Sequence, residues 1–425
     1  LTAHGGATSH AAVVARGMGK CCVTGCTGLK INEEAKCLEV DGKVYTDQDY
    51  ISVDGSTGDV FEGMLKLVPV DISGNFNTIM NWADEIRTIK VRTNADTPRD
   101  AEQAIEFGAE GIGLCRTEHM FFEEERIPAI REMIIADSEE ARRKALAKLL
   151  PFQKSDFKAM YKTLGERPMT VRLLDPPLHE FLPKTEEEMK QLSEISGVPI
   201  AKLQSEAAKL KEFNPMLGHR GCRLAVTYPE IAEMQAEAII TAALETSEEE
   251  GLDIVPEIMI PLVGTDKELL DVKKTVVETV ERCMEEAGRK IEYMVGTMIE
   301  IPRAALTADQ IAEEAEFFSF GTNDLTQYTL GVDRENSHVS SLYNEFSLAV
   351  LRLIEMTIRA GNDANIPVSV CGEMAGKSDS IMVLAGMGIR NLSMSPKLIS
   401  STKELLSHFT IAELEAISAK HLNNL

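Results

Sequence analysis

The sequence has 425 residues, of which 44% are hydrophobic, enough to bury a sizeable core in two domains or in one large barrel with an appendage. Its formal net charge of −24 excludes broad binding to nucleic acid and to anionic membrane surfaces, because such binding depends on Lys and Arg side chains that neutralise phosphates. No apolar run reaches the roughly 18–20 residues of a membrane span, and no basic-then-apolar signal segment opens the chain, so we expect a cytoplasmic protein.

The first informative segment is residues 5–17, Gly-Gly-Ala-Thr-Ser-His-Ala-Ala-Val-Val-Ala-Arg-Gly. Its apolar run at 11–15 predicts the first turns of a helix, with Thr8 or Ser9 as the N-cap. Unpaired N–H groups and the positive end of the helix dipole would stabilise an anion on or near His10. On spacing alone, a capped helix with an incidental histidine is the alternative.

Short strand and turn units follow, up to about residue 68. The candidate strands are Cys21–Val23, Cys37–Val40, Val44–Tyr45 and Tyr50–Val53, with turns at Asp41-Gly42 and Asp54-Gly55. The chain starts at Leu1 without an initiator methionine, directly before the histidine segment. We therefore expect residues 1–68 to form a small domain that lacks its N-terminal strands, within a longer protein.

The next segment, residues 69–88, predicts a connector. Its helical part is Asn75–Arg87, and we expect Trp82 to pack against one face of that helix. A domain that moves relative to its neighbour needs such a hinge.

After residue 88, short apolar segments alternate with helical ones, which is typical of a parallel sheet with crossover helices. The candidate strands are Ile89–Arg92, Gly111–Cys115, Met169–Leu173, Ile258–Val263, Met294–Ile299, Phe317–Phe320, Val368–Cys371 and Leu392–Met394. Eight strands predict an α/β fold, a (β/α)8 barrel over residues 89–425. One insertion, the charged stretch from about Lys184 to Glu212, predicts a helical hairpin exposed to solvent.

Polar side chains come directly after several of these strands. They are Arg92-Thr93-Asn94, Arg116-Thr117-Glu118, Arg172, Glu300, Asn323-Asp324 and Cys371-Gly372-Glu373. In a (β/α)8 barrel the carboxyl ends of the strands converge on one face, where the active site lies. We therefore expect these side chains to share one site, whereas an open sheet would spread them along an edge.

Glu300 and Asp324 are hard oxygen donors at neighbouring strand ends. Two carboxylates with substrate oxygens and water are common ligands of Mg²⁺, and structural acids bonded to backbone amides or to Arg303 are the alternative. Arg92 and Arg172 would approach the same mouth of the barrel. Their guanidinium groups suit carboxylate and phosphate oxygens, and simple ion pairs with the acids are the alternative.

The eight cysteines predict free thiols rather than a disulfide framework. Cys371 stands at a strand end, before a glycine. A buried core thiol is the ordinary interpretation of such a position, and a catalytic thiol is the other.

The segment Gly5–Gly19 resembles the phosphohistidine motif of the phosphoenolpyruvate (PEP)-utilising enzymes, above all of the pyruvate, phosphate dikinases. Further segments that resemble motifs of this family are Val91–Asp96, Gly113–Phe122, Thr170–Phe181, Asn214–Gly221, Gly296–Arg303 and Gly321–Leu325. The resemblance runs along essentially the whole chain. It implies a PEP- and pyruvate-binding barrel preceded by a swivelling phosphohistidine domain, which is N-terminally truncated here.

The resemblance also implies residue roles. His10 would carry the phosphoryl group, and Cys371 would act as acid and base at the methylene carbon of enolpyruvate. The substrate-binding residues would be Arg92, Arg172, Glu300, Gly321, Thr322, Asn323, Asp324 and Arg334, with Mg²⁺ on Glu300 and Asp324. Asn214 and Arg220 resemble further pocket residues. A thiol that delivers a proton must hold one, so the pKa of Cys371 should not be strongly depressed.

Two branches of the family match different parts of the chain. Residues 1–330 are most similar to the dikinases, which convert ATP, pyruvate and phosphate to AMP, PEP and diphosphate. Gln327–Arg334 and Cys371–Gly376 are more similar to enzyme I of the bacterial sugar phosphotransferase system. We expect a dikinase with an ATP-binding domain upstream, only the PEP half reaction in this chain, and a homodimer formed through the barrel. An enzyme I-type PEP–protein phosphotransferase and a non-catalytic PEP-sensing module are the alternatives.

Overall fold

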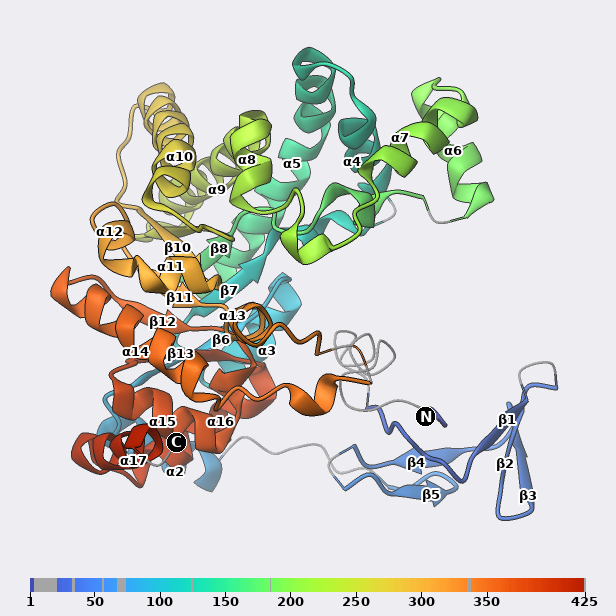
Figure 1. Cartoon of the computed structure of the whole chain (residues 1–425), viewed down its shortest axis with the longest axis vertical. Helices are drawn as coiled ribbons and strands as arrows, with labels where there is room; N and C mark the ends of the chain where they lie inside the picture. Colours follow the sequence, from blue (N-terminus) through green and yellow to red (C-terminus); the bar gives the residue numbers. More distant parts are fainter. Residues whose placement is uncertain are drawn as a thin grey trace. The chain divides into compact units, whose positions relative to one another are not determined.

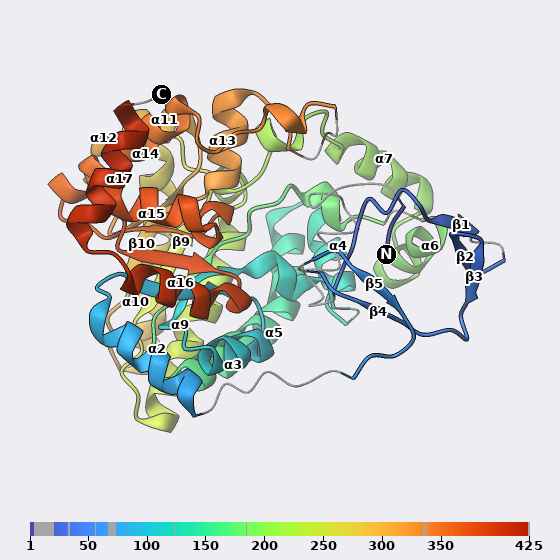
Figure 2. The ribbon, with the colours of Figure 1, turned by 90° about the horizontal axis from the view of Figure 1, so that it is seen from below.

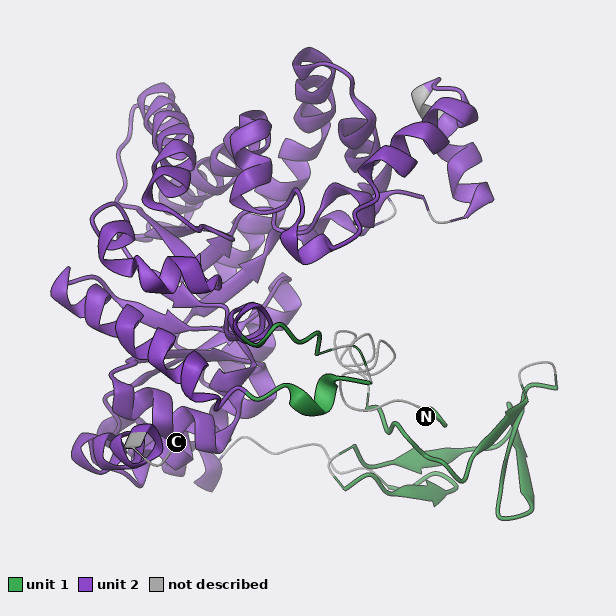
Figure 3. Cartoon of the chain, in the orientation of Figure 1, with its two compact units in different colours: residues 1–71, 330–344 green, residues 72–329, 345–425 purple. Residues whose placement is uncertain are grey.

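The computed structural model describes residues 1–3, 21–32, 35–55, 57–66, 74–123, 125–183, 185–334, 336 and 338–423. Contacts divide the chain into a first unit, Leu1–Asp71 with Leu330–Asn344, and a second unit, Ile72–Thr329 with Glu345–Leu425 (Figure 3). His10 and the helix predicted after it lie outside the described residues. In the described part of the chain, no helix is long and apolar enough to cross a membrane.

The first unit contains two small antiparallel sheets. They are β1 (Lys30–Asn32), β2 (Cys37–Val40) and β3 (Lys43–Thr46) in that order, and β4 (Ile51–Val53) with β5 (Val60–Glu62). Asp41 and Gly42 join β2 to β3 with positive φ angles of 50° and 77°, as a two-residue hairpin turn requires. The strand predicted at Cys21–Val23 is wrong. Among the described residues that segment belongs to no ladder. The Thr2 N–H donates to the Val23 carbonyl at 3.1 Å, and the Cys26 N–H donates to the Thr2 carbonyl at 3.0 Å.

Eight parallel strands of the second unit close into a barrel (Figure 1). In chain order they are β6 (Lys90–Asn94), β7 (Ile112–Arg116), β8 (Met169–Arg172), β9 (Pro256–Ile260), β10 (Met294–Ile299), β11 (Phe318–Phe320), β12 (Val368–Val370) and β13 (Asn391–Met394). Each strand pairs with the next, and β13 closes the barrel on β6, with Leu392 opposite Val91. The eight strands predicted for this region are confirmed, and with them the α/β barrel fold.

Helices cover the outside of the barrel (Figure 1, Figure 2). The helices of the second unit include α3 (Pro98–Glu106), α4 (Ile127–Ile135), α5 (Glu139–Leu164), α8 (Cys222–Thr227), α9 (Pro229–Glu250), α10 (Asp266–Ala287), α11 (Pro302–Leu306), α12 (Ala308–Ala312), α13 (Thr322–Leu330), α14 (Leu348–Asp363), α15 (Ser378–Met387), α16 (Ile399–Ser407) and α17 (Ile411–Asn423). The longest of these, α5, starts at Ser138, whose side chain accepts a hydrogen bond from the Ala141 N–H, and packs against α9. The side chains at the carboxyl ends of the strands form the barrel mouth.

The predicted helical hairpin is confirmed as α6 (Glu186–Ser196) and α7 (Ile200–Leu210). It is not solvated all round, because Met189, Leu192 and Leu203 form a small buried cluster between the two helices. Ile135 of α4 packs against the same cluster, so the hairpin is attached to α4 through an apolar contact.

The described part of the predicted connector contains α2 (Asn75–Ile86), which packs against α16 in the second unit. Lys403 of α16, only 2% exposed, pairs with Asp84 of α2 at 2.9 Å. The expectation that Trp82 packs one face of this helix is wrong, because its side chain is 59% exposed and the buried residue is Ala83.

Candidate active site

Two carboxylates meet at the carboxyl ends of β10 and β11. Glu300 follows β10 directly, and Asp324 lies in the first turn of α13. Glu300 is 2% exposed, and its Oε1 accepts a hydrogen bond of 2.7 Å from the Leu262 N–H. Burial and the carboxylates of Asp175 and Asp324 raise the pKa of Glu300 to about 8, against the opposing effect of two nearby arginines. Acids crowded in this way would be stabilised in their ionised form by a cation.

Two arginines lie beside these acids and share one carboxylate. Arg172, the last residue of β8, contacts Asp175 at 3.0 Å and also pairs with Glu118. Arg220 donates to Asp175 at 2.6 Å and to Asp324 at 3.1 Å. Burial acts to lower the pKa of each guanidinium group, but the surrounding carboxylates raise it above the ordinary value. Both groups therefore carry a fixed positive charge at the mouth.

Arg92 is held elsewhere in the barrel. Its Nη1 and Nη2 atoms contact the two oxygens of Glu257 at 2.7 and 3.2 Å, and Thr170 bonds to the same carboxylate. Thr170 and Glu257 are register partners, two positions before the pair Arg172 and Met259. The structure thus supports the ion-pair alternative for Arg92, and its contact with a substrate stays a prediction.

Arg116 occupies the position at the mouth that was expected of Arg92. It is the last residue of β7 and the register partner of Arg172, and its side chain is 32% exposed. The Asp96 carboxylate accepts a hydrogen bond of 2.7 Å from the Arg116 N–H and lies 3.4 Å from its Nη1 atom. Its place directly after a predicted strand marked Arg116 in the sequence, but only the register shows that it stands beside Arg172.

Cys371 follows β12 and is 4% exposed. Its Sγ lies 3.4 Å from the Ser319 Oγ and 3.4 Å from the Phe320 carbonyl oxygen. Burial raises the pKa of the Cys371 thiol, although the Ser319 hydrogen bond acts to lower it. The thiol therefore keeps its proton at neutral pH, as the proton-donor hypothesis requires.

The loops that follow β11 and β12 approach each other closely. A Cβ atom on Gly372 would lie 2.0 Å from the Thr322 Oγ1, and one on Gly321 would lie 2.7 Å from the Glu300 Oε2. The Asn323 Oδ1 accepts a hydrogen bond of 3.0 Å from the Glu373 N–H. The predicted residues from 321 to 324 are thereby brought to the Glu300 carboxylate and to the turn that carries Cys371.

Several buried polar atoms at this mouth have no hydrogen-bond partner among the described residues. They are the Arg172 Nε, the Glu118 Oε2, the Thr117 Oγ1 and the Thr322 Oγ1. Unsatisfied polar atoms are rare in protein interiors, and a cluster of them calls for a ligand or for water.

Besides Arg92, three further predicted residues are not among the side chains described for this cluster. His10 lies outside the described residues. Arg334 belongs to the segment Leu330–Asn344, which groups with the first unit. Asn214 is exposed, and its Oδ1 accepts a hydrogen bond of 3.1 Å from the Met216 N–H, so its visible role is to cap a short helical turn.

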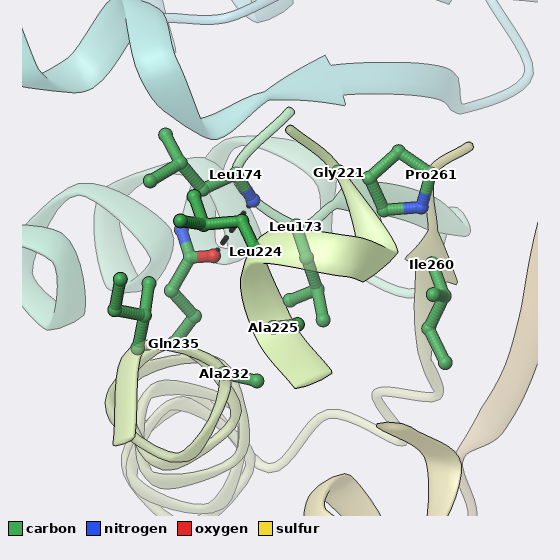
Figure 4. A pocket seen from close by; sticks show the side chains of 10 residues that line it. Leu173, Leu174, Gly221, Leu224, Ala225, Ala232, Gln235, Ile260 and Pro261 are labelled. Atoms are coloured by element: carbon green, nitrogen blue, oxygen red, sulfur yellow. Dashed lines mark hydrogen bonds between the residues drawn. The ribbon is translucent and has the colours of Figure 1, made fainter. Parts of the chain in front are cut away.

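A small apolar cavity of about 10 Å³ lies between the ends of β8 and β9 and the helices α8 and α9 (Figure 4). It is lined by Leu173, Leu174, Gly221, Leu224, Ala225, Ile231, Ala232, Gln235, Ile260 and Pro261. The Gln235 Oε1 accepts a hydrogen bond of 2.8 Å from the Leu174 N–H at its edge. A space of this size holds about one water molecule, so it is not the substrate site.

Two models of known protein families match the chain. Residues 71–411 match the PEP-binding domain of PEP-utilising enzymes, and residues 1–58 match the mobile domain of the same enzymes.

The chain is 56% identical to the pyruvate, phosphate dikinase of Clostridium symbiosum over 411 residues, which are 93% of this chain and 47% of that protein. It is 46% identical to the Rhizobium meliloti dikinase over 99% of this chain and 49% of that protein. For the chloroplastic dikinase 1 of Oryza sativa subsp. japonica the identity is 47%, over 93% of this chain and 44% of the relative. The chain spans about half the length of the curated relatives it matches.

Proposed function

The chain belongs to the PEP-utilising enzymes, and from this premise we propose that its barrel transfers a phosphoryl group between PEP and His10, with pyruvate as the other product. The observation that carries the proposal is the group of charged residues at the barrel mouth. Glu300 and Asp324 stand beside Arg172 and Arg220, and the protonated thiol of Cys371 follows a neighbouring strand. Carboxylates, guanidinium groups and an acid are the set that such a transfer needs.

Mg²⁺ fits the donor set of this mouth. Glu300 and Asp324 supply two hard carboxylate donors. In the described residues no group of three or more His, Cys, Asp or Glu side chains could hold a metal ion, so other ligands would have to complete the shell around these two carboxylates. Mg²⁺ is commonly held by one or two carboxylates, with water and substrate oxygens completing its shell. Bound there, the ion would supply charge neutralisation for the phosphoryl and enolate oxygens.

The protein groups then have separate tasks. Arg172 and Arg116, neighbours at the ends of β8 and β7, balance the negative charge of the phosphoryl group. The imidazole of His10 forms a bond to phosphorus as the bond from phosphorus to the enol oxygen breaks. The enolate receives at its methylene carbon the proton of the Cys371 thiol, which becomes a thiolate and regains a proton from solvent.

The wider activity follows the relatives. We propose that the chain is part of a pyruvate, phosphate dikinase in which an upstream domain binds ATP, and that this chain alone performs the PEP half reaction. A cytoplasmic location and a homodimer formed through the barrel belong to the same proposal.

Replacement of Asp324 tests the role of the acids at the mouth. Asp324→Asn removes one of the two carboxylates, so we expect PEP-dependent pyruvate formation with Mg²⁺ to fall by about a hundredfold or more. Asp309→Asn, at an exposed position of α12, is the matched control and should keep the parent rate. Undiminished turnover in Asp324→Asn would refute the assignment.

A further inference from the structure

We propose that Asn94 is a positioning residue for Cys371: it holds the turn that carries the thiol, without being the acid itself. The inference rests on the proposed function of Cys371 as proton donor. Asn94 is the last residue of β6, two strands away from β12 in the barrel order. Its side chain crosses the intervening strand β13 to reach the turn after β12.

The contacts of Asn94 fix the orientation of its amide group. The Asn94 side-chain nitrogen lies 3.0 Å from the Cys371 carbonyl oxygen, and its Oδ1 lies 2.6 Å from the Ser393 Oγ. A carbonyl oxygen can only accept, so the amide must present its N–H₂ group to Cys371 and its oxygen to the Ser393 hydroxyl. Both ends of the amide are therefore engaged, and the side chain has one defined position.

Ser393 is itself seated by the neighbouring strand. It is 2% exposed, and a Cβ atom on Gly113 of β7 would lie 2.5 Å from the Ser393 Cβ and 2.6 Å from its Oγ. Only a residue without a side chain at position 113 leaves room for this hydroxyl. Gly113, Ser393 and Asn94 thus form a support across β7, β13 and β6 that ends at Cys371.

The hydrogen bond from Asn94 to the Cys371 carbonyl lies just beyond the end of the β12–β13 ladder. The last register pair between β12 and β13 is Val370 with Leu392, so the Cys371 carbonyl lies one residue beyond the ladder. On its other side, the Cys371 N–H still donates to the Phe320 carbonyl at 3.2 Å. Asn94 therefore holds the peptide group that leads out of Cys371, while β11 holds the one that leads into it.

The proposed proton transfer depends on the position of the Cys371 sulfur. A proton reaches the methylene carbon only when the sulfur lies within contact distance and on one face of the enolate, and small displacements lower such rates strongly. Releasing the Cys371 carbonyl would let the turn shift, while the carboxylates and arginines that bind the substrate keep their own contacts. Loss of Asn94 should therefore lower the rate of proton transfer more than the affinity for pyruvate.

The test compares four variants of the full chain with the parent. Asn94→Leu removes both hydrogen bonds at similar volume, and Asn94→Asp keeps an acceptor for Ser393 but offers no donor to Cys371. Thr279→Val is the matched control, because the buried Thr279 Oγ1 donates to the Thr275 carbonyl at 2.8 Å within α10, a comparable bond that reaches neither Asn94 nor Cys371. Cys371→Ala tests the proposed function separately.

Two readouts are measured: exchange of the pyruvate methyl protons in D₂O with Mg²⁺, by NMR, and alkylation of Cys371 by iodoacetamide, by peptide mass spectrometry. We expect both Asn94 variants to lower kcat for exchange about tenfold or more with KM changed less than about twofold, and to alkylate Cys371 severalfold faster. Thr279→Val should match the parent in both readouts.

The two proposals fail in different ways. Exchange and alkylation at the parent rates in both Asn94 variants, or equal changes in Thr279→Val, would overturn the positioning role while leaving Cys371 as the acid. Exchange that persists in Cys371→Ala would instead overturn the proposed function. If an Asn94 variant does not fold, Ser393→Ala, which removes only the support of the Asn94 amide, should still show a smaller change of the same kind.

Discussion

Asp175 binds two guanidinium groups at once, those of Arg172 and Arg220, and so connects the end of β8 to the segment just before α8. Burial acts to raise the pKa of the Asp175 carboxyl, but the two arginines lower it below its ordinary value. The ionised form is thus the one that the fold stabilises. Removing this charge would leave two buried guanidinium groups with fewer partners.

The first residue-scale prediction concerns Asp175→Asn. We expect the free energy of unfolding near pH 7 to fall by about 3 kcal/mol, because one partner of a buried charge cluster is lost. A carboxyl with a lowered pKa in the folded state stabilises the protein above its unfolded pKa of about 4 and loses this contribution as the pH falls through the folded value. The difference between parent and variant should therefore shrink below about pH 4.

Denaturant titrations followed by circular dichroism at several pH values measure this difference. Asp309→Asn serves again as the control and should show no difference from the parent. A gap between parent and Asp175→Asn that stays constant down to low pH would contradict the account.

The residue types at the mouth could be predicted from the sequence, but the partners that their side chains contact could not. Glu300, Asp324 and Cys371 stand where the strand ends place them. Arg92 was expected at the mouth on the same grounds, yet Glu257, 165 residues away along the chain, accepts hydrogen bonds from both of its terminal guanidinium nitrogens. Such a pairing depends on strand register around the barrel, which a single sequence does not display.

At the scale of elements, the barrel strands could be predicted because each is a short apolar run between polar turns. The three-residue strands β1 and β5 were not predicted. Each has only three residues, all of them exposed, so neither belongs to a buried face that a longer apolar pattern would mark. Cys21–Val23 has the apolar composition of a strand but no partner ladder, which shows that pairing and not composition makes a strand.

The element-scale prediction concerns the approach of the turn after β12 to the start of α13. Gly372→Ala would place a Cβ atom 2.0 Å from the Thr322 Oγ1 and 2.7 Å from the Thr322 backbone nitrogen. We expect a loss of about 1–3 kcal/mol in stability, since the backbone has to move, together with a fall in pyruvate-forming activity. Thermal unfolding and turnover assays measure the two effects.

Gly28→Ala is the control for this substitution, because a Cβ atom there would meet no described residue within 4 Å. Parent-like stability and activity in Gly372→Ala would show that the two loops have more freedom than the structure assigns to them.

At the scale of the whole molecule, the proposed transfer joins a histidine of the first unit to a substrate held by the second. The predicted boundaries of the connector, at residues 68 and 88, remain predictions. The described part of the connector shows which unit its helix contacts. Its helix α2 is tied to α16 by the buried Lys403 and its partner Asp84, so this part of the connector belongs with the barrel. A hinge would then have to lie before α2.

Phosphorylation of His10 by PEP is the most direct test of the central claim. The parent chain, His10→Ala and Asp324→Asn are each incubated with PEP and Mg²⁺, and the site of any phosphate is found by mass spectrometry. We expect a phosphate on His10 of the parent that is labile to acid and stable to alkali, with pyruvate released in equal amount, no label at this position in His10→Ala, and labelling slowed about a hundredfold or more in Asp324→Asn. Equal labelling of the parent and His10→Ala, or pyruvate release without any label on His10, would contradict the claim.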